Sequence, residues 1–279
     1  SKERLEKNLD AIGETAAAQD ADLMLLQEVD FDSDRSYHVD EALKLRTFDG
    51  LDVSTDSVFA VNYHSAYLFY PITQPHGASN SGLLTTSKLG IRSAVRRSLP
   101  VETGVTKLLD LDRCYSISRV PTDNGKELVI FLLHMSAYGN SDAIREGQIR
   151  MLSQDMQKEY EAGNYVLCGG DFNHDLKASN DDNDDAADYE SWAYPFPREE
   201  LPEHLSFCID QLSDTERNAL WNSARNADME YIPGETYTVT LDGFIISDNI
   251  ECLQYENVNT GYSYSDHDPV YMKFKLLDN

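Results

Sequence analysis

The chain lacks several patterns that would mark its class at once. Its four cysteines, Cys114, Cys168, Cys208 and Cys252, are widely spaced and form no Cys-x-x-Cys pair, so a zinc cluster is not expected and no disulfide can be assigned. No run approaches the roughly 18 apolar residues of a membrane-spanning helix. No secretory leader precedes "SKERLEKNLD", which has the pattern of a domain interior, so we expect the natural N-terminus to lie upstream.

Basic residues are also scarce. Among the 279 residues there are 23 lysines and arginines against 49 aspartates and glutamates, which gives a formal net charge of −26. A surface of this sign repels the phosphate backbone that clustered lysines and arginines attract, so nucleic acid is not the favoured partner. Such acidity serves solubility in most proteins, but we expect a small subset of the carboxylates to bind metal.

The patterns that are present indicate many strands with a few helices between them. Apolar residues at helical spacing, from Leu5 to Ala16, predict an amphipathic helix over about residues 2–19. The pair Asn124-Gly125 between two apolar runs predicts a hairpin. The expected fold is therefore a single α/β sandwich domain over residues 1–279, with mixed sheets inside and helices outside.

The stretch "CGGDFNHD" holds the clearest chemical signal. It follows the apolar run Tyr165–Cys168, which predicts a short buried strand. Gly169 and Gly170 are expected to end that strand in a tight turn. Asp171 and Asn173 then emerge at the carboxyl end of the strand, the edge where ligands bind in sheets covered by helices.

Polar side chains stand at the ends of further apolar strands. Each alone has an ordinary structural explanation: Glu28 could be a surface strand end, His134 a satisfied histidine and Asp266 the start of an Asx-turn. Because the strand ends of one sheet lie close together in space, their recurrence favours a shared site instead. The side chains expected to converge in one cleft are Glu28, His134, Asp171, Asn173, Asp242, Asp266 and His267.

In this order, the segments "LLQEVD", "GGDFNHD", "LDGFIIS" and "SDHDP" resemble the endonuclease/exonuclease/phosphatase superfamily, over about Leu5 to Lys275. Its branches include pancreatic-type deoxyribonucleases, apurinic endonucleases, neutral sphingomyelinases, inositol polyphosphate 5-phosphatases and deadenylases. "GDFN" together with a terminal "SDH" is specific, whereas "LDG" alone is weak. The resemblance implies a four-layer α/β sandwich with two packed mixed β-sheets, and hydrolysis of phosphoester bonds by in-line attack of water.

For the cofactor, the resemblance implies Mg²⁺ or Mn²⁺ held by oxygen ligands. Glu28 matches the family's carboxylate ligand, and Asp266 matches an aspartate that binds the metal or a water. Hard cations of this kind prefer oxygen and keep several waters. An anionic phosphoester needs such neutralisation of charge before a nucleophile approaches phosphorus.

Further residues match the family's catalytic groups. Asp171 matches the residue that orients or deprotonates the attacking water, and Asn173 matches the amide that holds water or a phosphate oxygen. His267 matches the catalytic histidine, whose pKa suits proton exchange near neutral pH, and Asp242 matches the carboxylate that orients it. His134 matches the second histidine, which donates to a phosphoryl oxygen or to the leaving group.

Two features depart from the family's pattern. Members begin with a strand that ends in asparagine, and no such strand precedes the predicted helix, so residues 1–279 are expected to lack the family's first strand. No glutamate near "PHGASNSGLLTTSK" is a convincing partner for the second histidine, as the nuclease branch requires. Asn80 in that segment and Arg35 beyond Glu28 are the predicted substrate-binding residues, since a guanidinium suits phosphate geometry.

These motifs define the reaction better than the substrate. We expect a metal-dependent phosphodiesterase or phosphatase that acts, as a monomer, on a small or lipid phosphoester. A nuclease with the same chemistry is one alternative, and an inactive binding domain of the same fold is another. The net charge of −26 argues against the nuclease, and the retained motif residues argue against the inactive domain.

Overall fold

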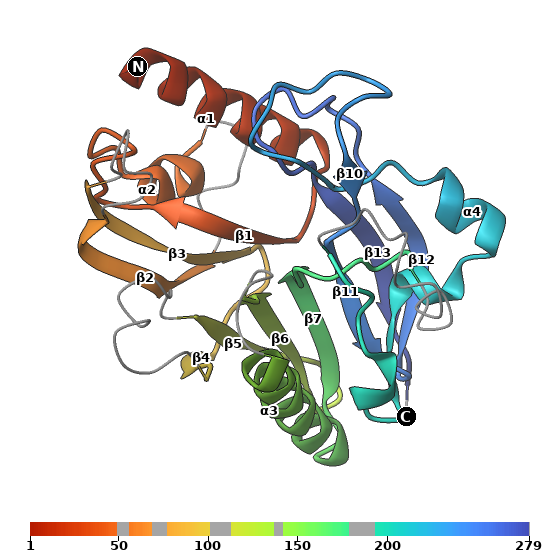
Figure 1. Ribbon diagram of the computed structural model, residues 1–279. Coiled ribbons are helices and arrows are strands. Elements are labelled where there is room, and N and C mark those ends of the chain that lie inside the picture. The colour runs from red at the N-terminus through yellow and green to blue at the C-terminus, as the bar shows by residue number, and fades with distance from the viewer. Residues whose placement is uncertain (49–55, 69–76, 101–112, 137–141, 179–192, 279) are drawn as a thin grey trace. The chain divides into compact units, whose positions relative to one another are not determined.

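The computed structural model describes residues 1–48, 56–68, 77–100, 113–136, 142–178 and 193–278. The chain divides into two compact units, Ser1–His134 and Met135–Asn279, which Figure 1 colours from red through green to blue. Each unit contains both strands and helices. The prediction of a single domain over the whole chain stays a prediction.

The first unit combines two helices with an antiparallel sheet whose strand order is β1-β3-β2. Helix α1 begins after Ser1, whose hydroxyl accepts from the Arg4 amide, and Asp40 caps α2 by accepting from the Leu43 amide. The predicted amphipathic helix is confirmed as α1. The elements are α1 (Lys2–Ala18), β1 (Leu23–Asp30), α2 (Glu41–Arg46), β2 (Asp56–Leu68) and β3 (Gly77–Ser87).

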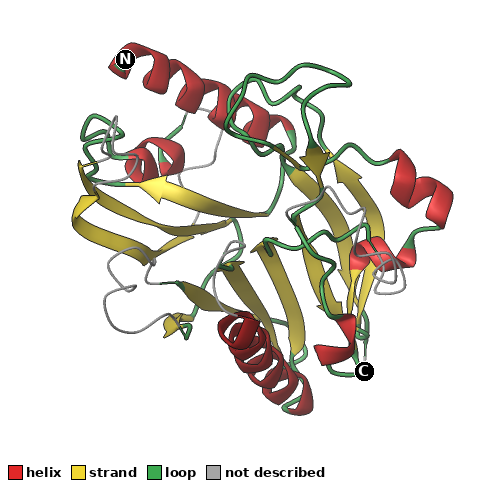
Figure 2. Ribbon diagram, viewed as in Figure 1, coloured by secondary structure: helices red, strands yellow, loops and turns green. Residues whose placement is uncertain are grey.

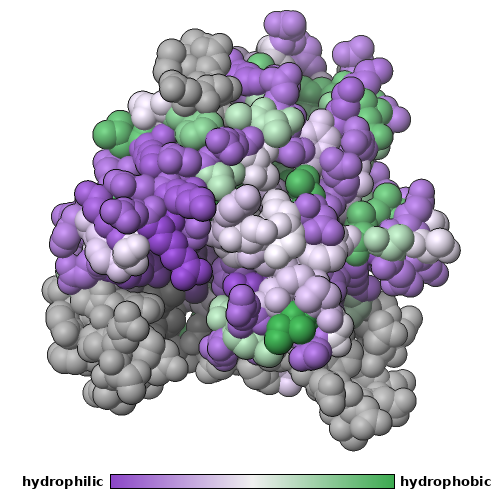
Figure 3. Space-filling model, turned by 90° about the horizontal axis from the view of Figure 1, so that it is seen from above, coloured by the Kyte–Doolittle hydropathy of each residue, from purple (hydrophilic) through white to green (hydrophobic). Residues whose placement is uncertain are grey.

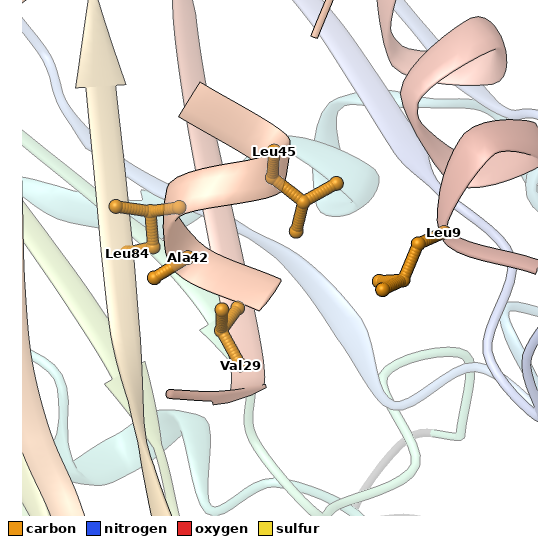
Figure 4. Packing of buried hydrophobic residues seen from close by; sticks show 5 residues of the cluster. All are labelled: Leu9, Val29, Ala42, Leu45 and Leu84. Atoms are coloured by element: carbon orange, nitrogen blue, oxygen red, sulfur yellow. The ribbon is translucent and has the colours of Figure 1, made fainter. Parts of the chain in front are cut away.

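Both helices bury apolar side chains against this sheet. Figure 4 shows Leu9 of α1, Ala42 and Leu45 of α2, Val29 of β1 and Leu84 of β3, which form one cluster. All five residues are buried, and Leu84 has no exposed surface. Removing these side chains from water holds α2 against β1, close to the place where Glu28 stands.

Three further strands of the first unit pair antiparallel in the order β4-β5-β6, as part of a second sheet. The turn at Asn124-Gly125 joins β5 to β6 as predicted, and Gly125 has a φ of 79°, which glycine adopts without strain. Leu83 of the first sheet and Leu132 of the second belong to one buried cluster, so the two sheets pack together. The strands are β4 (Ser93–Ser98), β5 (Cys114–Pro121) and β6 (Glu127–His134).

The second unit is organised around β11, which pairs antiparallel with β7 on one side and with β8 on the other. Helix α3 packs along β7 (Figure 2), and β12 and β13 form an antiparallel ribbon. The elements are α3 (Asp142–Glu161), β7 (Tyr165–Asp171), η3 (Arg198–Glu200), β8 (Leu205–Phe207), η4 (Cys208–Gln211), α4 (Asp214–Ala219), β9 (Ala224–Arg225), β10 (Thr238–Val239), β11 (Asp242–Ser247), β12 (Ile250–Asn257) and β13 (Val270–Leu276).

One strand of the second unit differs from its prediction. The prediction that Gly169 and Gly170 end a strand is wrong: β7 continues through both glycines to Asp171, because β11 supplies a partner for each of these residues. The neighbouring apolar segment, residues 238–247, forms two strands, because β10 pairs with β9 while β11 begins only at Asp242.

The face drawn in Figure 3 is covered mainly by hydrophilic and near-neutral residues, with a few separate hydrophobic patches. A polar exterior of this kind agrees with the formal net charge of −26. Within the described ranges, no helix is both long enough and apolar enough to cross a bilayer.

Candidate functional site

Asp171 and Asp242 stand opposite each other at the end of the β7–β11 ladder. The register of this antiparallel pair is unbroken from Leu167 and Ile246 to the two aspartates. Side chains directly opposite across such a pair have Cβ atoms about 5 Å apart. The strands therefore hold two carboxylates side by side, although Asp171 is buried and like charges repel.

His267 lies beside both carboxylates. Its Nδ1 lies 2.8 Å from Oδ2 of Asp242, and its Nε2 lies 4.0 Å from Oδ2 of Asp171. Burial alone would lower the pKa of this histidine, but the charges of Asp242, Asp171 and Asp266 raise that pKa well above its usual value. The ring is thus oriented by one carboxylate, with its second nitrogen on the side of the other.

Ser223 belongs to this arrangement, although no motif in the sequence marks it. Its fully buried hydroxyl donates to Oδ2 of Asp242 at 2.7 Å and accepts from the amides of Leu241 at 3.0 Å and Asp242 at 3.1 Å. A serine hydroxyl has one proton and two lone pairs, so all of its hydrogen-bonding capacity is used. Oδ2 of Asp242 therefore has partners on two sides, Ser223 and His267.

A buried aspartate, Asp268, anchors the segment that carries His267. Its carboxylate accepts from the indole nitrogen of Trp221 at 2.8 Å and from the amide of Thr260 at 3.1 Å. Its own amide donates to the carbonyl of Ser223 at 2.7 Å. These bonds tie the segment before β13 to the segment that holds Ser223, and so they set the position of His267.

Asn173 lies just beyond β7 in a left-handed backbone conformation, with φ at 50°. Its amide donates to Oδ1 of Asp171 at 2.8 Å, and its side-chain Nδ2 donates to the carbonyl of Met135 at 2.7 Å. Strained backbone at residues other than glycine concentrates at functional sites. Here the two hydrogen bonds hold Asn173 beside the Asp171 carboxylate.

In the first unit, Glu28 projects from a β-bulge. β1 pairs regularly with β3 except between Leu26 and Val29, where the register shifts, and Glu28 has a φ of 54°. Bulges re-aim side chains and are common beside active sites, and the side chain of Glu28 is 61% exposed. The expectation that Glu28 closes its strand is corrected, because the strand continues past the bulge to Asp30.

His134 ends β6, as predicted, and lies near Glu28. Its Nδ1 is 3.9 Å from Oε1 of Glu28, and its side chain is only 6% exposed. The bulge and the end of β6 therefore bring a buried imidazole next to an exposed carboxylate within the first unit.

Arg35, predicted to bind phosphate, is paired with a carboxylate of its own unit. Its Nε and Nη2 donate to the two oxygens of Asp30 at 2.8 Å and 2.7 Å. Burial alone would lower the pKa of Arg35, but this bidentate pair with Asp30 raises it. Glu41 accepts from the Asp30 amide at 3.0 Å, so α2 holds the same end of β1.

Asn80, also predicted to bind substrate, has hydrogen bonds to the loop after β1. Its Nδ2 donates to the carbonyl of Asp32 at 2.6 Å, and its amide donates to Oγ of Ser33 at 2.7 Å. Its Oδ1 contacts Nδ1 of His64. These bonds fix the loop against β3, and a role of Asn80 in binding substrate stays a prediction.

Across the described parts of the chain, one group of acidic, histidine or cysteine side chains is compact enough to share a metal ion: Asp171, Asp242 and His267, whose ligand atoms lie within 4.8 Å of one another. The aspartate oxygens suit Mg²⁺ or Mn²⁺. Nδ1 of His267 is already bonded to Asp242. The donor set therefore fits a hard cation through oxygen and leaves the imidazole for proton transfer.

The predicted side chains are found in two groups, one in each unit. The first unit brings together Glu28 and His134. Their convergence with the other group in one cleft stays a prediction. The second unit brings together Asp171, Asn173, Asp242, Asp266 and His267.

Comparison with known proteins agrees with the motifs. The sequence model described as "Endonuclease/Exonuclease/phosphatase family" matches residues 1–234. The predicted resemblance to this superfamily is confirmed. No curated protein sequence matches the chain.

Solved structures share the fold at low sequence identity. An endonuclease/exonuclease/phosphatase from Beutenbergia cavernae is 17% identical with a TM-score of 0.71, over 96% of this chain and 66% of that chain. The human Nocturnin catalytic domain is 17% identical with a TM-score of 0.61, over 97% and 86% of the two chains. A Bacteroides thetaiotaomicron mannosyl-6-phosphatase is 16% identical with a TM-score of 0.61, over 98% and 92%. These likenesses concern the fold alone, and they confirm the predicted α/β sandwich class.

Proposed function

Because the chain belongs to the Endonuclease/Exonuclease/phosphatase family, we propose that it is a divalent-metal-dependent hydrolase of small or lipid phosphoesters. The observation that carries this proposal is the position of His267 beside Asp242 and Asp171. An imidazole that is oriented by one carboxylate and near a second carboxylate is suited to acid–base catalysis of hydrolysis.

The proposed chemistry divides the work among three side chains of the second unit. Asp171 accepts the proton of the attacking water. Nε2 of the charged His267 donates to a phosphoryl oxygen and stabilises the charge that develops there. Asp242 keeps the imidazole oriented and charged, and Asn173 orients Asp171 through its amide.

We propose that Glu28 in the first unit and Asp266 in the second would each offer an oxygen ligand to Mg²⁺ or Mn²⁺, and the oxygens of Asp171 and Asp242 would suit the same kind of ion. When bound, the metal supplies positive charge that neutralises the phosphate during attack. Glu28 suits this role because the bulge exposes its carboxylate to solvent. His134 beside it is proposed to donate to a phosphoryl oxygen or to the leaving group.

Arg35 and Asn80 are proposed to contact the substrate. Asp30 occupies Nε and Nη2 of Arg35, so Nη1 is the guanidinium nitrogen that has no hydrogen bond to the described residues. The ion pair orients the guanidinium and leaves Nη1 for a phosphate oxygen. The net charge of −26 supports a small or lipid phosphoester over nucleic acid.

A substrate panel with Mg²⁺ or Mn²⁺ tests the function. The panel contains bis-p-nitrophenyl phosphate, p-nitrophenyl phosphate, sugar and inositol phosphates, sphingomyelin and plasmid. A mannosyl-6-phosphatase among the structures of similar fold supports including the sugar phosphates. We expect hydrolysis of a small or lipid phosphoester that stops in EDTA and returns with added metal.

A variant of Glu28 tests whether hydrolysis depends on a bound metal. Glu28→Gln should raise the metal concentration needed for half-maximal rate and lower the rate, because it removes one anionic oxygen ligand. Undiminished hydrolysis in excess EDTA would reject metal dependence. Cleavage of plasmid alone would favour the nuclease, and inactivity on the whole panel would favour the binding domain.

A further inference from the structure

Cys208 and Cys252 lie outside the proposed site, and the fold brings both to the β12–β13 ribbon. Cys208 begins η4 and Cys252 lies in β12, and each thiol affects the pKa of the other. Sγ of Cys208 also lies 3.0 Å from Sδ of Met272 in β13. Both cysteines are free thiols in this structure.

The register of the β12–β13 ribbon explains how these sulfur-bearing side chains come to one face. Cys252 stands opposite Phe274, and Met272 is two positions before Phe274 on the same strand, so both sulfur-bearing side chains belong to one face of the ribbon. η4 contacts β12 and brings Cys208 to this face. The register shifts between Cys252 and Gln254, so the ladder is already interrupted next to Cys252.

The two thiols differ in the way that disulfide exchange requires. The interaction with the Cys208 thiol lowers the pKa of Cys252, which is partly exposed. The same interaction, together with burial, raises the pKa of Cys208, which has no exposed surface. Because the thiolate is the attacking species, Cys252 is the expected nucleophile and Cys208 the resolving thiol.

Cys114 and Cys168 do not share these features. Both are fully buried, and burial raises the pKa of Cys114 to about 11 and that of Cys168 still further. Buried thiols of this kind are inert. They therefore serve as internal controls for any reagent that reacts with Cys252.

We propose that Cys208 and Cys252 form a reversible disulfide when the protein meets a low-molecular-weight disulfide such as oxidised glutathione. The Cys252 thiolate attacks one sulfur of the reagent, which forms a mixed disulfide and releases one reagent thiolate. Cys208 then loses its proton to water and attacks the sulfur of Cys252, which expels the second reagent thiolate. Two protein thiols are oxidised, one reagent disulfide is reduced to two thiols, and the released protons end on those thiols.

This modification site is independent of phosphoester hydrolysis, so its test is chemical. The full chain is incubated with oxidised glutathione, denatured, alkylated with N-ethylmaleimide, digested without reductant and analysed by mass spectrometry. We expect one cross-linked peptide pair containing Cys208 and Cys252, with Cys114 and Cys168 alkylated. The intact oxidised chain should lose about 2 Da relative to the reduced chain, and dithiothreitol should restore both thiols.

Single variants separate the two steps. Cys208→Ser should stop at a mixed disulfide on Cys252, Cys252→Ser should leave Cys208 unmodified, and the matched control Cys168→Ala should keep the cross-link. A stable mixed disulfide on wild-type Cys252, four alkylated thiols after oxidation, or a cross-link to Cys114 or Cys168 would each overturn the proposal. The wild-type result decides the matter alone if a serine variant does not fold.

Discussion

The side chain of Asp242 determines the charge and the orientation of His267. Asp242→Asn keeps the shape of the group but removes the negative charge beside Nδ1 of the imidazole. We expect kcat to fall by about 10²–10⁴-fold, because the charged ring is no longer stabilised. Steady-state kinetics with saturating Mg²⁺ measure this loss, and thermal unfolding checks that the variant remains folded. A variant with wild-type kcat would remove this pair from the proposed mechanism.

Ser223 offers a milder test of the same geometry. Ser223→Ala removes the donor to Oδ2 of Asp242, and we expect kcat to fall about tenfold, equivalent to about 1.4 kcal/mol, while KM changes little. Ser247→Ala is a matched control, because Ser247 is equally buried and bonds Asn249 and Val166 instead. If both variants lose stability and neither loses kcat, the hydroxyl of Ser223 has only a structural role.

At the level of elements, helix α2 contacts β1 through Glu41, and ionisation of the Glu41 carboxyl opposes folding. Burial raises the pKa of Glu41 to about 7 from its usual value of 4.5, although its bond from the Asp30 amide favours the charged form. The folded chain binds this proton more tightly than the unfolded chain. The stabilisation is therefore fully present below about pH 4.5 and is lost as pH rises through about 7.

Glu41→Gln should remove this dependence on pH. We expect the free energy of unfolding of the wild type to fall by about 2 kcal/mol more than that of the variant between pH 4.5 and 8, the shift being reduced because Glu41 is not fully buried. Urea unfolding at several pH values measures the difference. Glu14→Gln on the exposed side of α1 is the control, and identical profiles for Glu41→Gln and the wild type would contradict the prediction.

Elements set by a local pattern could be predicted from the sequence. The helical spacing of apolar residues predicted α1, and Asn124-Gly125 predicted the hairpin, because helical periodicity and turn geometry involve neighbours in the chain. Gly169 and Gly170 were wrongly predicted to end a strand, because only a distant partner, β11, keeps them in the ladder. A strand end predicted from residue composition is wrong where hydrogen bonding to another strand determines how far the strand continues.

In the candidate site too, features set by the local sequence could be predicted, and features set by distant partners could not. His134 and Asp171 could be located from motifs, because each ends an apolar run that is itself a strand. Ser223 could not, because a serine without a motif becomes significant only when folding brings it to Asp242. The pairing of Arg35, predicted to bind phosphate, with Asp30 five residues earlier could not be predicted either, because this contact depends on the local path of the loop.

For the whole molecule, the net charge of −26 predicts how salt affects catalysis. An acidic protein repels anionic substrates, and salt screens this repulsion over a Debye length that falls from about 30 Å at 0.01 M to about 8 Å at 0.15 M. We expect KM for p-nitrophenyl phosphate to fall across this range. The fall should be smaller for bis-p-nitrophenyl phosphate, which carries less charge, and equal salt effects on both esters would contradict the explanation.

The ladder between β7 and β11 limits which sequence changes homologues of this protein can tolerate. Asp171 and Asp242 face each other because their main chains are hydrogen-bonded in one register, not because any particular apolar side chain precedes them. A shift of one residue would turn every side chain of β7 to the opposite face. Homologues that keep this chemistry should therefore exchange the apolar residues of β7 freely, yet align here without a single insertion or deletion.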